Sequence, residues 1–100
     1  MSRVAQSAVP READPTSCFS IHAEAHPGVM PRVLGLFAKR GLVPSSWTSR
    51  VGSEQDLTID IQMRGMSAEL TDYIASCLRQ IVGVEVVLVS EKRAIAISNP

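Results

Sequence analysis

The sequence predicts an α+β domain whose strands and helices follow the order β-α-β-β-α-β. Four stretches are strand-like, most of them because apolar and polar residues alternate with a period of two. Two longer stretches repeat apolar residues at the spacing of one helix face. One hundred residues, of which 45% are apolar, are enough for a single domain with its own core.

The first strand is predicted over residues 18–24, and a helix follows the turn at Pro27-Gly28. The inward-facing strand residues are Phe19, Ile21 and Ala23. Pro31 is tolerated only in a first helical turn, so the helix begins near Gly28, and Gly41 ends it. The expected apolar stripe of this helix comprises Met30, Val33, Leu34 and Phe37.

Two strands joined by a polar turn are predicted next. Residues 43–51 form the first. Pro44 removes a ladder N–H, so this is an edge strand, or an edge that begins pairing only after Pro44. Residues 56–63 alternate cleanly and complete a hairpin. Their inward-facing residues are Leu57, Ile59, Ile61 and Met63.

The second helix is predicted to begin with Ser67 as its N-cap and to end at Gly83. Its apolar stripe comprises Leu70, Tyr73, Ile74, Cys77, Leu78 and Ile81. A last strand over residues 84–89 places Val84, Val86 and Leu88 on one face and Val87 and Val89 on the other. Apolar residues on both faces indicate that this strand is covered on both sides, and a second subunit is one candidate for the cover.

This order of elements predicts the ferredoxin-like arrangement, a four-stranded antiparallel sheet with two helices on one face. Right-handed crossovers place the first and third strands in the centre of the sheet. The edge strand at residues 43–51 is then free to pair with its copy, which predicts a homodimer with an eight-stranded sheet. Residues 1–16 are expected to form a disordered N-terminal tail, and residues 91–100 a C-terminal tail.

Charge and composition argue against several classes of partner. Ten basic and ten acidic residues give a formal net charge of zero, which argues against electrostatic binding of nucleic acid or of an anionic membrane. The outward positions of the two central strands offer no aromatic ring on which a base could stack. These positions are Ser20, His22, Glu24, Thr58, Asp60 and Gln62. No apolar run approaches the about 20 residues of a membrane span, and the N-terminus lacks the apolar block of a secretory signal.

The sequence also offers little for catalysis or metal binding. It has no nucleophile elbow, paired-carboxylate motif or phosphate loop, so we expect a non-catalytic protein without a cofactor. Cys18 and His22 share a strand face, but about 13 Å of extended chain separates them, which is too far for one metal ion. Cys18 and Cys77 lack a metal-type spacing and are interpreted as reduced, buried thiols of a cytoplasmic protein.

The turn at Pro27-Gly28 is a candidate binding site. A glycine at a helix start leaves backbone N–H groups uncovered, here those of Gly28, Val29 and Met30. Together with the positive end of the helix dipole, such groups suit a carboxylate or a phosphate. The alternative is a tight connection between strand and helix that binds nothing.

Residues 25–41, which read AHPGVMPRVLGLFAKRG, resemble the opening of an ACT domain. More narrowly, they resemble the small regulatory subunit of acetolactate synthase (acetohydroxyacid synthase), and residues 80–86 resemble its second helix end and last strand. The resemblance gives an ACT domain over residues 17–90. It implies a subunit that dimerises and activates a separate catalytic subunit, which depends on thiamin diphosphate. Many members also bind valine or another branched-chain amino acid at the dimer interface.

The resemblance further implies where an amino-acid effector would bind. The expected effector-binding residues are Ala25, His26, Gly28, Val29, Met30, Val43 and Pro44. In the family, asparagine or aspartate stands at the position of Ala25, and asparagine commonly stands at that of Val43. Both polar anchors are apolar here, so we expect weak or no valine feedback. A short, single-ACT type of the family tends to lack valine control as well.

Three functions follow from these observations. The first is an activating small subunit of acetolactate synthase in branched-chain amino acid biosynthesis, for which the catalytic subunit supplies the cofactor and the chemistry. The alternative is a free-standing ACT module that senses an amino acid or another small anion. The third is a purely structural dimerisation module.

Overall fold

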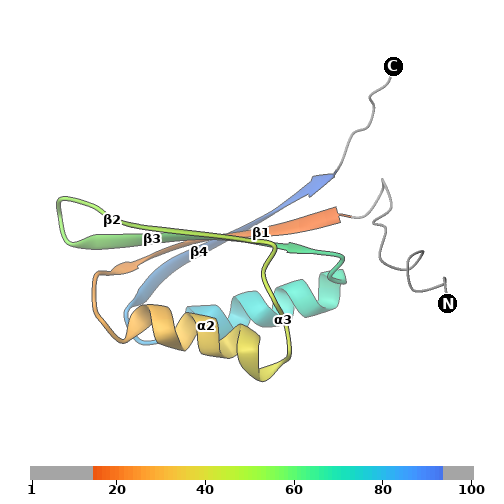
Figure 1. Cartoon of the computed structure of the whole chain (residues 1–100), viewed down its shortest axis with the longest axis horizontal. Helices are drawn as coiled ribbons and strands as arrows, with labels where there is room; N and C mark the ends of the chain where they lie inside the picture. Colours follow the sequence, from red (N-terminus) through yellow and green to blue (C-terminus); the bar gives the residue numbers. More distant parts are fainter. Residues whose placement is uncertain (1–14, 94–100) are drawn as a thin grey trace, which may run out of the picture.

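The computed structural model describes residues 15–93, and the predicted element order is confirmed within them. The elements are β1 (Pro15–Glu24), α2 (Val29–Lys39), β2 (Ser46–Val51), β3 (Asp56–Arg64), α3 (Ala68–Arg79) and β4 (Val84–Arg93). Both helices lie on the same side of the sheet (Figure 1). The fold is therefore the expected ferredoxin-like α+β arrangement.

The four strands form one antiparallel sheet in the order β2-β3-β1-β4. The first and third strands are central, as predicted, and β2 and β4 are the edges. Phe19 pairs with Ile61 of β3 and with Val89 of β4, which aligns the inward-facing positions of neighbouring strands. The β4 edge is partly shielded, because Arg79 of α3 donates a hydrogen bond to the Val87 carbonyl at 2.9 Å.

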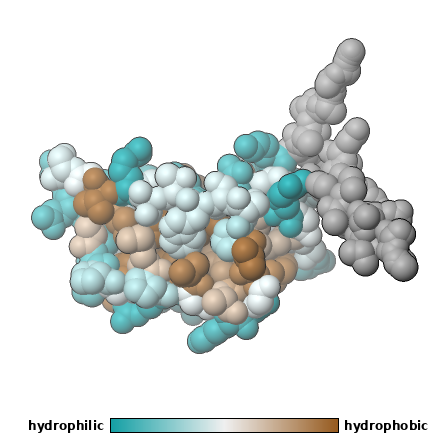
Figure 2. Space-filling model, in the orientation of Figure 1, coloured by the Kyte–Doolittle hydropathy of each residue, from teal (hydrophilic) through white to brown (hydrophobic). Residues whose placement is uncertain are grey.

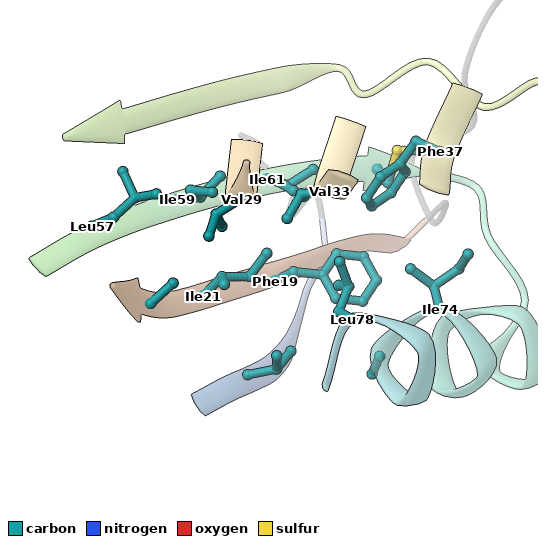
Figure 3. Packing of buried hydrophobic residues seen from close by; sticks show 14 of the residues in the cluster. Phe19, Ile21, Val29, Val33, Phe37, Leu57, Ile59, Ile61, Ile74 and Leu78 are labelled. Carbon is teal, nitrogen blue, oxygen red and sulfur yellow. The ribbon is translucent and has the colours of Figure 1, made fainter. Parts of the chain in front are cut away.

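The core fills the space between the sheet and the two helices (Figure 3). Side chains of β1 and β3 point toward Val33 and Phe37 of α2 and toward Ile74 and Leu78 of α3. The rings of Phe19 and Phe37 meet edge to face, with centroids 6.0 Å apart and planes at 74°. Burying such a side chain contributes about 1.5–3 kcal/mol, so this layer supplies most of the driving force for folding.

The predicted helix stripes are only partly correct. In α2 the buried residues are Val29, Val33 and Phe37, whereas Met30 and Leu34 are exposed. In α3 the buried residues are Thr71, Ile74, Ala75 and Leu78, and Tyr73 is half exposed. Each apolar stripe is wider than the strip of helix that the sheet covers. Tyr73 instead lies beside Arg40, whose guanidinium carbon is 5.0 Å from the ring centroid and whose Nη2 donates to the phenol oxygen at 2.8 Å.

Strand boundaries differ from the predicted ones at three places. β1 begins at Pro15 and β4 continues to Arg93, so the tails expected at 1–16 and 91–100 are too long at their inner ends. The ends of these strands pair with each other, as Pro15 does with Arg93, and backbone pairing needs no apolar alternation. β2 begins at Ser46, which confirms the alternative that pairing starts only after Pro44. The rest of both predicted tails, 1–14 and 94–100, lies outside the described residues.

The predicted faces of β4 are wrong at its start. A bulge lets Ala23 pair with Val84 while His22 pairs with Val86, so Glu85 is an extra residue. Val84 consequently packs against the core on the side of buried Val87, and not with Val86 and Leu88. Within residues 15–93, Val86 and Leu88 are exposed, and their cover by a second subunit stays a prediction.

Both cysteines are free thiols, but they are only half-buried and not buried as expected. Ser17 and Phe19 are buried on the inward face of β1, so Cys18 between them lies on the outward face. Its partners in the neighbouring strands are Gln62 and Ser90. Cys77 lies in α3, which packs on the opposite, inward face. The correction follows from alternation in the strand, which turns residue 18 away from the helices.

Gly83 provides a test of the packing between α2 and the entry to β4. Its φ is +101°, and a Cβ added there would lie 2.9 Å from Cγ2 of Val29. We predict that Gly83→Ala lowers the free energy of unfolding by about 1–3 kcal/mol, because it combines backbone strain with a clash. Urea unfolding of the full chain measures the change.

Gly35→Ala is the matched control for Gly83→Ala. Gly35 is helical, and a Cβ there meets nothing within 4 Å. This change should raise the free energy of unfolding by up to about 1 kcal/mol. Equal stability of the two variants would contradict the packing described for Gly83.

Candidate functional site

The connection from β1 to α2 forms a hydrogen-bonded corner of the domain. The N–H of Ala25 donates to the Gln55 carbonyl at 2.9 Å, and that of His26 donates to the Glu24 carbonyl at 2.8 Å. Gly28 has φ −83° and ψ −10°, an ordinary helical conformation that any residue adopts. A glycine is favoured there by space, because a Cβ would lie 3.1 Å from Nη1 of Arg32 and 3.4 Å from Nδ1 of His26.

Of the three backbone N–H groups proposed to bind an anion, two already donate hydrogen bonds to His26 within the turn. The N–H of Gly28 donates to Nδ1 of His26 at 3.1 Å. The N–H of Val29 donates to the carbonyl of His26 at the same distance, and Val29 is fully buried. The helix start therefore offers an anion fewer donors than the Pro-Gly motif alone indicates.

Arg32 adds a positive charge to this corner that the sequence analysis did not single out. Its guanidinium folds back over Gly28, four residues earlier on the same face of the helix. The helix N-terminus and the Arg32 guanidinium are both positive and repel each other. An anion bound between them would be attracted by both. The four-residue spacing from Gly28 to Arg32 is the feature of the sequence from which this contact could have been predicted.

An apolar groove of about 650 Å³ lies between the first half of α2 and the start of β2. Its lining comprises Pro27, Met30, Pro31, Leu34, Pro44 and Trp47. Apolar side chains gather on this face of the molecule (Figure 2). The groove exists because Met30 and Leu34, which were expected in the core, are turned outward toward Trp47.

The seven predicted effector residues do not form one surface. Met30 and Pro44 line the groove, while His26, Gly28 and Val29 make up the turn. Ala25 packs against the core, and Val43 is 83% exposed and outside the groove lining. The groove is also lined by Pro27, Pro31 and Trp47, which were not predicted to belong to a site.

No group of His, Cys, Asp and Glu side chains within residues 15–93 is placed to hold a metal ion. Over the same residues, neither helix has the length and apolar character needed to cross a bilayer.

The contact between His26 and Gly28 predicts a local contribution to stability. We expect His26→Ala to lower the free energy of unfolding by about 0.5–1 kcal/mol, because the Gly28 N–H loses its acceptor. His22→Ala is the control, since His22 is exposed on the open face of β1 and its replacement should change little. Urea unfolding compares the two, and an equal effect would show that the imidazole does not hold the turn.

Solved structures with the same fold are distant in sequence. The ACT domain from GTP pyrophosphokinase of Chlorobium tepidum is 16% identical, with a TM-score of 0.67, over 77% of this chain and 99% of that one. The C-terminal domain of the MgtC protein from Mycobacterium tuberculosis is 12% identical, with a TM-score of 0.65, over 89% and 99%. The regulatory subunit of aspartate kinase from Thermus flavus is 14% identical, with a TM-score of 0.60, over 82% and 53%.

A search of curated proteins finds no match. A family model described as the ACT-like domain matches residues 10–96, which is most of the chain. ACT domains are regulatory, non-catalytic modules. The chain therefore belongs to the ACT-like domain family.

Proposed function

We propose that this chain is a dimeric regulatory subunit that activates a separate enzyme, the thiamin-diphosphate-dependent catalytic subunit of acetolactate synthase. The observation that carries the proposal is the apolar groove beside the β2 edge, together with the internal use of the Gly28 and Val29 donors. An apolar surface next to a free strand suits another protein better than it suits a charged metabolite. The motif at residues 25–41 is what points to acetolactate synthase.

Valine would be poorly held at this corner. Its carboxylate and ammonium groups would lose water, and a buried charge without partners costs several kcal/mol. The family's two polar anchor positions are Ala25 and Val43, and neither side chain can form a hydrogen bond. The proposed subunit therefore acts with weak or no valine feedback, and it works in the cytoplasm with its catalytic partner.

The proposed dimer forms through β2. Gly52 donates to the Asp56 carbonyl at 2.8 Å, so by alternation residues 46, 48 and 50 direct their backbone groups toward β3. Trp47, Ser49 and Val51 then direct theirs outward, to the free edge. If two copies pair their β2 strands antiparallel with Ser49 at the centre, Trp47 lies opposite the partner's Val51. Both side chains are then on the side of the sheet that carries the helices. Val51 is 61% exposed in the single chain, and this pairing would place it against the groove.

A second candidate function is a free-standing ACT module that senses a small anion. Arg32 is the observation that favours it, because its guanidinium lies against Gly28 at the helix N-terminus. Under this candidate the groove holds the apolar part of the ligand and Arg32 its carboxylate.

Ser49→Pro tests the dimer without breaking the monomer's own sheet. Proline removes an N–H that points away from β3, so the inner ladder stays intact while the pairing between copies is lost. At micromolar concentration the wild-type chain should sediment at twice 10.8 kDa and the variant at 10.8 kDa, with unchanged far-UV circular dichroism. Ser49→Ala should remain dimeric. A wild-type chain that sediments as a monomer would refute the dimer.

Reconstitution tests the activating role. Adding this chain to the acetolactate synthase catalytic subunit of the same organism should raise acetolactate formation severalfold, and added valine should not reverse the effect. The monomeric Ser49→Pro chain should activate less, because half of the proposed contact surface is missing. An unchanged rate with the wild-type chain would rule out the acetolactate synthase role and leave the sensing module.

A further inference from the structure

The free edge of β4 is the second place where another strand could join the sheet. A dimer that pairs its two β2 strands has used both of its β2 edges, so the strand at each end of its sheet is β4. β4 is ten residues long, and Val86 and Leu88 are exposed on it. A long, exposed and apolar edge strand is a template for pairing with further chains. Because every dimer carries two such edges, pairing of β4 with β4 has no closing step and would extend the sheet into a fibre.

The backbone of β4 turns alternate residues toward the free edge. Glu24 of β1 donates to the Gly83 carbonyl at 3.0 Å, so by alternation the even-numbered residues of β1 bond to β4. Leu88 pairs with an even-numbered residue of β1 and therefore directs its N–H and C=O groups inward. Val87 and Val89 consequently direct theirs to the free edge, where an added strand would bind.

Arg79 already occupies one of these outward groups. It stands in the last turn of α3, and its Nη2 donates to the Val87 carbonyl at 2.9 Å in a partly buried contact. A carbonyl oxygen can accept two hydrogen bonds, but the guanidinium lies in the path that an added strand would take. Such a strand would have to displace Arg79 or bury its charge, and both are unfavourable.

The two edges of the sheet thus differ in their protection. Among residues 15–93, no side chain donates a hydrogen bond to the outward backbone groups of β2, whereas Arg79 caps the middle of β4. We infer that Arg79 blocks the β4 edge and so confines assembly of this chain to β2, which gives a closed dimer and not an open fibre. The inference rests on the dimer of the proposed function, to which it adds the residue that limits growth of the assembly.

Arg79→Ala tests the block by freeing the Val87 carbonyl. Arg79 is exposed and alanine is a good helix former, so the fold of the single chain should be kept, which far-UV circular dichroism checks. Sedimentation velocity of the full chain is measured from micromolar to millimolar concentration. The wild-type chain should remain a dimer throughout, whereas the weight-average mass of Arg79→Ala should rise with concentration to about twice the dimer mass or more.

Lys39→Ala is the matched control, because Lys39 stands in the last turn of α2 and its loss changes the net charge equally. This variant should remain dimeric. Val89→Pro added to Arg79→Ala should restore the dimer, since proline removes an N–H at the free edge of β4 and leaves the pairing with β1 intact. An Arg79→Ala chain that stays dimeric, or growth that Val89→Pro does not stop, would overturn the inference.

Ser49→Pro separates this inference from the proposed dimer. A chain with both Ser49→Pro and Arg79→Ala should form dimers joined through β4 alone, and a monomer would contradict growth through that edge. If the wild-type chain is a monomer but Arg79→Ala associates, the β2 dimer fails and the block by Arg79 stands. If the wild-type chain is a dimer and Arg79→Ala does not grow, the block fails by itself. If both chains are monomers, both fail.

Discussion

The inner face of β1 is the surface on which the rest of the structure depends. β1 pairs along its length with β3 on one side and β4 on the other, and Phe19 and Ile21 are buried beneath the helices. A shift of one residue in either pairing would turn these side chains outward and expose the core, so the register is strongly determined. The same strand ends at the β1–α2 corner, and it therefore sets the position of the candidate site.

Most of the sheet was predictable from the sequence because a period of two leaves only two faces to choose from. The inward positions of β1 and β3 were correctly predicted for this reason. The helices were less predictable, since Met30, Leu34 and Tyr73 continue an apolar stripe beyond the strip that the sheet covers. The error at Val84 has a different origin, because a bulge at Glu85 cannot be recognised in a run of valines.

The candidate sites were less predictable than the fold because they depend on side-chain conformation and on contacts between distant residues. The Pro27-Gly28 turn was recognisable, but the use of the Gly28 N–H by His26 depends on the direction of the imidazole. Arg32 was visible only as a polar position on a helix. The buried hydrogen bond between the hydroxyls of Ser17 and Thr71 joins residues 54 positions apart, and nothing in the sequence near either residue indicates the other.

A ligand or a partner protein can act through this domain only if it binds two states of the domain with different affinity. α3 is the element through which such a difference would be transmitted. The hydroxyl of Thr71 in α3 is hydrogen-bonded to that of Ser17 in β1, Tyr73 two residues later contacts Arg40 at the end of α2, and Arg79 donates to the Val87 carbonyl on the β4 edge. These contacts hold α3 on the sheet and, through Arg40, the C-terminal end of α2. The first half of α2 forms one wall of the apolar groove, so a movement of α3 on the sheet would reach the proposed protein interface through α2.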